Sequence, residues 1–217
     1  MDSTLYFGFA VSLAGLFFLI FNAIIYIKKI KFKSFQYKIL SYYLLTLSIL
    51  EILCNVIGFI KMNSNFFLSH FVFNIHFGFL SYFFYYFFKD QRIKKLIFTA
   101  YLIFISIIIL QTIINPEIFW TFNLFEILAS SFLIIIYSFL AIYKVLDSSK
   151  PKYFFLCTGI IIYFISNSII HAAGELNVVF LEKPVFIDLW IFSAFSYIVF
   201  QYFIFKEWQN LAYAEPR

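Results

Sequence analysis

Residues 71–88, FVFNIHFGFLSYFFYYFF, form a stretch that is apolar enough to cross a membrane and yet carries polar side chains. On a helix, several small or polar residues of this stretch share one face, because they lie three or four positions apart: Asn74, Gly78, Ser81, Tyr82 and Tyr85. Lipid chains offer such a face no hydrogen-bond partners, so a second helix or a water-filled cavity must cover it. We therefore expect the other helices to pack around this one.

The composition indicates a helical membrane protein. Of the 217 residues, 64% are hydrophobic and 12% are charged, and the mean hydropathy is +0.93. A soluble domain usually has about 25% charged residues. The apolar runs are about 20 residues long, the length that crosses a hydrocarbon core of about 30 Å, whereas a membrane barrel shows alternating segments of about ten residues. The predicted fold class is all-α, a polytopic bundle of membrane helices.

Seven predicted spans make up a single transmembrane domain over residues 1–217. Their approximate limits are 5–27, 39–60, 71–88, 96–114, 122–146, 153–173 and 187–205. The first apolar run has no basic segment ahead of it and is longer than a signal-peptide core, so we expect it to be retained as a membrane helix. All four prolines lie outside the spans, so no span is expected to be kinked by proline.

Basic residues indicate the orientation of the spans. The segments that follow spans one, three, five and seven contain 14 of the 16 lysines and arginines, and the other side has only Lys61 and Lys183. Because basic loops stay in the cytoplasm, we expect the N-terminus outside, the C-terminus inside, and a location in the cell inner (plasma) membrane. The net charge of +5 is confined to these segments, which argues against a nucleic-acid partner.

A parallel repeat is a further expectation. Sliding spans two and three onto spans six and seven aligns similar polar residues, namely Asn55 with Asn167 and Ser81-Tyr82 with Ser196-Tyr197. A 3+1+3 arrangement with span four as the linker would explain these alignments. Chance is the alternative, because chains rich in phenylalanine and isoleucine align with themselves easily.

The strongly polar residues within the spans fall in the outer half of the predicted bundle. The candidate ligand-binding residues are Glu51, Asn55, Asn74, His76, Glu126, Asn167 and His171. Residues four positions apart on a helix face the same way, which applies to the first two and to the last two of this set. Ionisable groups at such depth cost several kcal/mol unless they are paired or hydrated, so we predict a polar pocket open to the outside. Interhelical hydrogen bonding without a ligand is the alternative for the asparagines.

The inner half carries mainly hydroxyl groups. Four of them are candidates for inner-face packing or for coupling to a partner: Ser81, Tyr82, Ser196 and Tyr197. If the protein is a sensor, we expect its output to pass through a separate signalling protein on the cytoplasmic side.

Metal and nucleotide chemistry find little support in the sequence. A catalytic metal needs three protein ligands and an open position. His76, His171 and Glu126 could meet, but no HxxxH or HExxH motif fixes two ligands on one helix, and no Walker or GxGxxG motif occurs. We therefore predict no catalytic residue, no metal and no cofactor. An intramembrane metal-dependent hydrolase is the second alternative function.

The function that fits the asymmetry of the polar residues best is a non-enzymatic sensor or accessory signalling subunit. Its outer pocket would bind a small ligand of unknown identity, and its inner surface would contact another protein. A small-solute transporter is the first alternative, because seven helices with a parallel repeat are similar to the sugar-transporting 3+1+3 families. Those families use prolines within their helices as hinges, and this chain has none there.

Three segments carry a resemblance to a known group of proteins: NIHFGFLSYFFYYFFKD (74–90), PKYFFLCTGIIIYFISNSI (151–169) and DLWIFSAFSYIVFQYFIFKEW (188–208). They resemble seven-helix integral membrane proteins of Bacteroidota, which are often encoded beside histidine kinases. The resemblance implies a protein embedded in membrane lipid that serves as a sensory or regulatory partner of a histidine kinase. It brings no catalytic residues with it.

Overall fold

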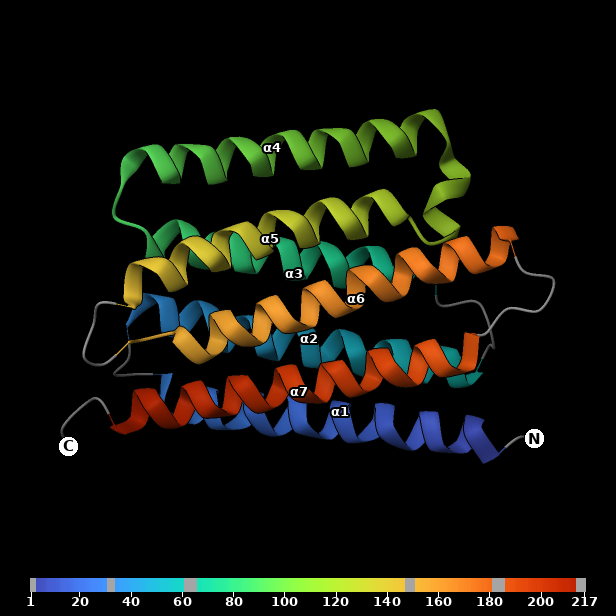
Figure 1. Cartoon of the computed structure of the whole chain (residues 1–217), viewed down its shortest axis with the longest axis horizontal. Helices are drawn as coiled ribbons and strands as arrows, with labels where there is room; N and C mark the ends of the chain where they lie inside the picture. The colour runs from blue at the N-terminus through green and yellow to red at the C-terminus, as the bar shows by residue number, and fades with distance from the viewer. Residues whose placement is uncertain (1–2, 31–33, 61–65, 147–150, 181–185, 214–217) are drawn as a thin grey trace. The chain divides into compact units, whose positions relative to one another are not determined.

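The computed structural model describes the backbone of residues 3–30, 34–60, 66–146, 151–180 and 186–213, with the side chains of 3–6, 174–180, 186–190 and 212–213 outside the description. All regular structure in these ranges is helical (Figure 1), which confirms the predicted all-α class. The helices are α1 (Ser3–Lys28), α2 (Phe35–Ile60), α3 (Phe67–Phe87), α4 (Gln91–Ile114), the short 3-10 helix η2 (Pro116–Trp120), α5 (Leu124–Val145), α6 (Phe154–Phe180) and α7 (Phe186–Tyr213).

Six of the described helices, α1 to α6, are long and apolar enough to cross a membrane. At about 1.5 Å per residue, a helix of this length matches the hydrocarbon core. Large apolar side chains point outward along them, with Phe59 86% and Ile114 82% exposed. These helices are consistent with a multi-pass membrane protein in contact with lipid. The predicted seventh span begins among side chains outside the description.

Several helices extend beyond the predicted spans. α4 begins at Gln91, five residues before the predicted limit, because Asp90 caps it: Asp90 Oδ1 accepts a hydrogen bond from the Arg92 amide at 2.7 Å. α3 begins at Phe67, so His70, which was expected in a loop, is helical. α6 continues to Phe180 through part of the predicted outer segment 174–186. Apolarity limits the part of a helix that lies in lipid, whereas caps and backbone hydrogen bonds set where the helix ends.

The chain divides into two compact units, the central unit (residues 23–134) and the terminal unit (residues 1–22 and 135–217). In the central unit, α3 packs against α2 on one side and α4 on the other, and η2 contacts both α3 and α4 (Figure 1). Phe77 of α3 anchors the contact with α4, because its ring lies 5.7 Å from that of Tyr101 and 4.4 Å from that of Phe104.

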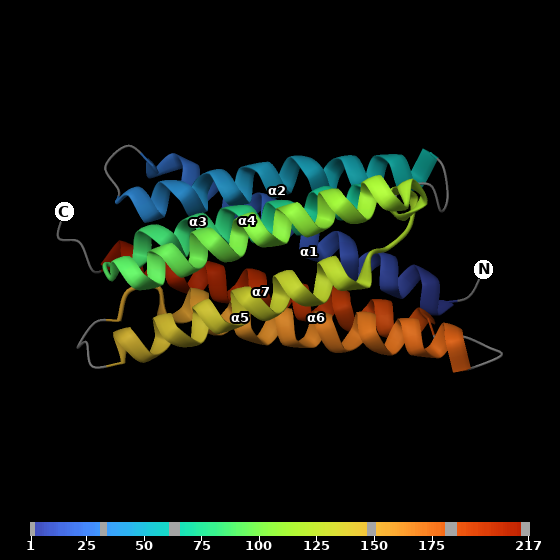
Figure 2. The same ribbon diagram turned by 90° about the horizontal axis from the view of Figure 1, so that it is seen from above.

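In the terminal unit, α6 packs against α7 (Figure 2). The two helices approach closely at Gly159, where an added Cβ would lie 2.5 Å from the Cβ of Phe203. One turn along α6, the ring of Tyr163 stacks on that of Phe200 at 5.0 Å. A glycine at this position therefore allows two helices with large aromatic side chains to pack closely.

Candidate functional site

A buried ionisable cluster joins α3 to the first turn of α5 in the central unit. His70 Nδ1 lies 2.5 Å from Glu126 Oε2, and Asn74 Nδ2 donates to Glu126 Oε1 at 2.7 Å. Asn74 Nδ2 also donates to the carbonyl oxygen of His70 at 2.8 Å. Two side chains one turn apart on α3 therefore bind both oxygens of a single carboxyl group. We call His70, Asn74 and Glu126 the polar cluster.

The second ring nitrogen of His70 faces the segment between α4 and α5. His70 Nε2 lies 3.1 Å from the carbonyl oxygen of Ile118 and 3.0 Å from that of Thr121. A carbonyl oxygen can only accept, so Nε2 carries a proton and donates it. A further proton must lie between Nδ1 and Glu126 Oε2 for that contact to be a hydrogen bond. His70 thus ties α3 to the connecting segment and to α5.

Burial makes this cluster energetically important. The side chain of Glu126 is 1% exposed and that of His70 is 11% exposed. A charge at such a site costs several kcal/mol unless it is paired and hydrogen-bonded. Asn74 Oδ1 is a buried acceptor that receives no hydrogen bond from the described residues. A donor group of a bound molecule would satisfy it.

His76, a predicted ligand-binding residue, lies on a different face of α3. It is 1% exposed, and its Nδ1 lies 2.8 Å from the hydroxyl oxygen of Tyr43 on α2. Residues two positions apart on a helix are separated by about 200°. Asn74 therefore faces Glu126 of α5, while His76 faces α2.

Glu51 and Asn55 share a face of α2, as their spacing predicts. Asn55 Nδ2 donates to the backbone carbonyl oxygen of Glu51 at 2.8 Å. The amide is thus partly engaged by its own helix, and both side chains are half-buried. Their role in ligand binding stays a prediction.

The two remaining ligand-binding candidates belong to the terminal unit. Asn167 is 2% exposed, and its Oδ1 accepts a hydrogen bond from the Ser193 hydroxyl at 3.2 Å. This bond joins α6 to α7 and is the kind of contact expected if Asn167 holds helices together. His171, one turn further along α6, is half-buried. The seven candidates are therefore divided between the two units, and a single pocket stays a prediction.

The four inner-face candidates differ in exposure. Ser81 and Ser196 are 3% and 6% exposed, and Ser196 Oγ donates to the Ser193 carbonyl oxygen at 2.8 Å. Tyr82 is 46% exposed, whereas the ring of Tyr197 lies 5.6 Å from that of Tyr163 within the terminal unit. Serine thus faces inward at both aligned positions, and Tyr82 faces outward.

Two buried polar groups were missed by the sequence analysis in addition to His70. The first is a pair of fully buried amides in the terminal unit: Asn22 Nδ2 donates to the backbone oxygen of Gln201 at 2.9 Å and to its Oε1 at 3.0 Å. Asn22 stands alone in the apolar run FFLIFNAIIYI, which was the available signal. A lone amide in such a run needs a partner, and α7 supplies it.

The second is Glu207, which caps α6 from α7. Glu207 Oε1 accepts the amide of Tyr153 at 2.7 Å, and Oε2 accepts that of Phe155 at 3.0 Å. Burial raises the pKa of Glu207 above its ordinary value, and the hydrogen bonds from these amides and from Asn210 oppose that rise. Sequence gave no signal for this cap, because donor and acceptor are more than 50 residues apart.

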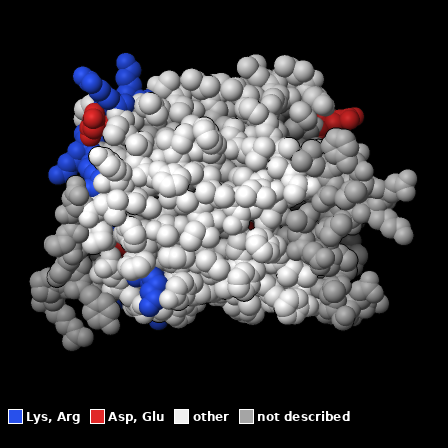
Figure 3. Space-filling view, in the orientation of Figure 1, with Lys and Arg blue, Asp and Glu red and all other residues white. Residues whose placement is uncertain are grey.

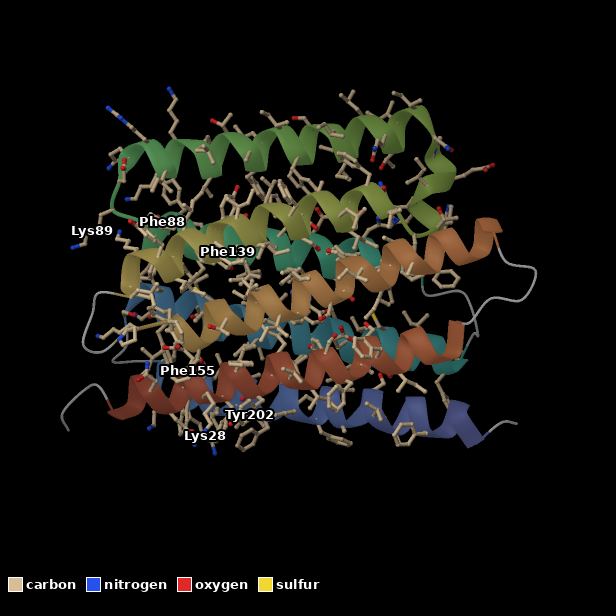
Figure 4. The ribbon with its side chains drawn as sticks, in the orientation of Figure 1. Lys28, Phe88, Lys89, Phe139, Phe155 and Tyr202 are labelled. Atoms are coloured by element: carbon tan, nitrogen blue, oxygen red, sulfur yellow. The ribbon has the colours of Figure 1, made fainter. Side chains whose placement is uncertain are left out.

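Basic side chains gather at the opposite end of α3 from the polar cluster. Four of them follow the end of α3 and are here called the basic corner: Lys89, Arg92, Lys94 and Lys95. Figure 3 shows basic side chains gathered where α4 begins, with an uncharged surface along the helix. Lys89 points away from the neighbouring helices (Figure 4). The only described acidic residue beside the corner is Asp90, the cap of α4.

Within the described part of the chain, no group of three or more His, Cys, Asp or Glu side chains could hold a metal ion. The polar cluster supplies only His70 and Glu126 of these types. Comparisons with protein-family models, with curated proteins and with solved structures find no match for this chain.

Proposed function

We propose that the protein is a non-enzymatic sensor or accessory signalling subunit of the cell inner (plasma) membrane, with the polar cluster as part of its input site. The observation that carries the proposal is the contrast between the two ends of the central unit. One end holds the buried polar cluster and the exposed Glu117. The other end holds every described lysine and arginine of that unit: Lys28, Lys29, Lys38, Lys89, Arg92, Lys94 and Lys95.

This contrast supports the proposed orientation. Basic ends of membrane helices remain in the cytoplasm, so the polar cluster would face the outside and the basic corner the inside. We retain seven crossings, an outside N-terminus and a cytoplasmic C-terminus as part of the proposal. The parallel 3+1+3 repeat is kept with it, and its support is that α2–α3 and α6–α7 are both closely packed pairs.

α3 provides a direct route from input to output. It runs without interruption from the polar cluster to the basic corner, and its 21 residues span about 30 Å at the usual rise. A ligand that donates to the unoccupied acceptor Asn74 Oδ1 would add a bond beside those that Nδ2 makes within the polar cluster, and we propose that it shifts α3 against α5. The signalling partner, such as a histidine kinase, would read that shift at the cytoplasmic end. Of the other candidates, Glu51, Asn55 and His76 belong to the central unit and are proposed to contribute to its outer end, and Asn167 and His171 are proposed to bind ligand within the terminal unit.

Purification in a mild detergent from native membranes tests the partner directly. Quantitative mass spectrometry is expected to find a kinase or another signalling protein in near-stoichiometric amount. A chain that purifies alone would refute the accessory-subunit proposal.

A matched pair of variants tests the input site. Glu126→Gln replaces the carboxyl group of the polar cluster with an amide, and Glu117→Gln makes the same replacement at an exposed residue of the same end. We expect Glu126→Gln to change the phosphorylation activity of the copurified partner in vesicles and Glu117→Gln to leave it unchanged. Equal activity in both variants would remove the polar cluster from the input site. A fluorescent protein fused to the C-terminus tests the orientation, because this reporter matures only in the cytoplasm. The proposed orientation predicts a fluorescent fusion.

A further inference from the structure

We propose that the basic corner binds the phosphate group of an anionic phospholipid. The site lies at the end of α3, with the start of α2 packed against one side of α3 and the start of α4 against the other. Gln36 Nε2 donates to the carbonyl oxygen of Tyr86 at 3.0 Å and joins the first two of these.

Charge is the first argument. Residues 89–95 contain four cations and one acid, Asp90, whose Oδ1 already accepts the amide of Arg92. Lys89, Arg92 and Lys95 are exposed, so their cationic groups are available to a ligand. The positive end of the α4 dipole lies at the same place and further favours an anion.

Position is the second argument. The basic corner lies where α3 is connected to α4, and both helices are long and apolar enough to cross the membrane. Charged residues at such a connection lie at the level of the lipid headgroups, where phosphates are concentrated. The large exposed side chains Leu96 and Phe98 follow immediately on α4 and fit the adjoining acyl chains, since they are 58% and 55% exposed.

Aromatic side chains give the third argument and favour a lipid over a soluble anion. Phe35, Tyr82 and Tyr86 are 48%, 46% and 39% exposed. Their rings form a continuous surface, with 4.6 Å between those of Phe35 and Tyr86 and 4.9 Å between those of Tyr82 and Tyr86. Lys94 Nζ lies 5.4 Å from the centre of the adjacent Tyr85 ring, which links the aromatic surface to the cations. Amphipathic rings of this kind favour the membrane interface, and a free phosphate ion would gain nothing from them.

The test uses the full-length protein in nanodiscs of defined lipid composition. Native mass spectrometry counts the phosphatidylglycerol and phosphatidylcholine molecules that remain bound, for the wild type and for Arg92→Gln/Lys95→Gln. Lys144→Gln/Lys152→Gln is the matched control, because it removes two exposed lysines from the terminal unit.

A basic residue near an anionic surface strengthens association about fivefold. The corner variant is therefore expected to bind phosphatidylglycerol about 25-fold more weakly than the wild type, and the control variant is expected to lose less, because its lysines lie outside the basic corner. Three results would overturn the proposal: equal phosphatidylglycerol binding by the corner variant and the wild type, equal retention of phosphatidylcholine and phosphatidylglycerol by the wild type, and displacement of the lipid by millimolar glycerol phosphate. The last result would indicate a site for soluble phosphate.

Discussion

Substitutions in the polar cluster should separate the loss of its charge from the loss of its hydrogen bonds. In Glu126→Gln, the new amide Oε1 still accepts from Asn74, and its Nε2 donates to a neutral His70 at Nδ1. His70 Nε2 continues to donate to the carbonyl oxygens of Ile118 and Thr121. Since every bond has a replacement, we expect this variant to lose only about 1 kcal/mol.

Removal of one partner should cost much more. In His70→Leu, the carboxyl group of Glu126 stays buried and keeps only the Asn74 bond. Truncation of one member of a buried ion pair costs about 3–5 kcal/mol, and we expect a loss in that range. Glu126→Leu should fall in the same range, because it leaves His70 and Asn74 without their shared acceptor. The double variant His70→Leu/Glu126→Leu should lose about 2 kcal/mol less than the sum of the two single variants.

Unfolding by sodium dodecyl sulfate in mixed micelles, followed by circular dichroism, measures these differences. Each variant is compared with the wild type at one detergent composition, and Glu117→Leu serves as the control for an exposed glutamate at the same end. Additive losses within about 0.5 kcal/mol would show that His70 and Glu126 do not stabilise each other. A loss in Glu126→Gln as large as that in Glu126→Leu would contradict the proposed exchange of donors.

Three further predictions test the terminal unit. Because the pKa of Glu207 is raised in the folded protein, the stability that Glu207 contributes is complete below the ordinary glutamate pKa and is lost as pH rises through the raised pKa. The thermal midpoint of the wild type should therefore fall between these two pKa values. The thermal midpoint of Glu207→Gln should not fall there. Gly159→Ala should destabilise by about 1–3 kcal/mol, because its Cβ would lie 2.5 Å from that of Phe203, and a loss below 0.5 kcal/mol in detergent titration would contradict this packing. Asn22→Leu should cost about 1–3 kcal/mol by leaving the buried Gln201 amide unpaired, and Asn22→Leu/Gln201→Leu should recover part of that loss; no recovery would argue against the pair.

The helical class and the apolar crossings could be predicted from sequence because they follow from local properties. Run length, composition and helical spacing are read along a single segment, and lipid forces each apolar run to satisfy its own backbone hydrogen bonds. The limits of the helices were less accurate. Asp90 moved the start of α4 into the basic segment, and α6 continued past Gly174, because helix ends depend on caps and contacts as well as on apolarity.

The candidate site was predicted only in part for a related reason. Asn74 and Glu126 stood out in the sequence as polar residues in apolar runs, and the structure brings them together. His70, which completes their cluster, was assigned to a loop, where a histidine needs no explanation. Glu126 is 56 residues from His70, so no spacing rule could have joined them.

The sequence by itself therefore determined which segments are helical, which ones suit a membrane, and which polar residues need partners. Tertiary structure decided the partners: Glu126 for His70, Tyr43 for His76, and Gln201 for Asn22. The physical reason is that desolvation penalises a buried polar group wherever it lies along the chain, whereas the hydrogen bond that offsets the penalty depends on which helices pack together.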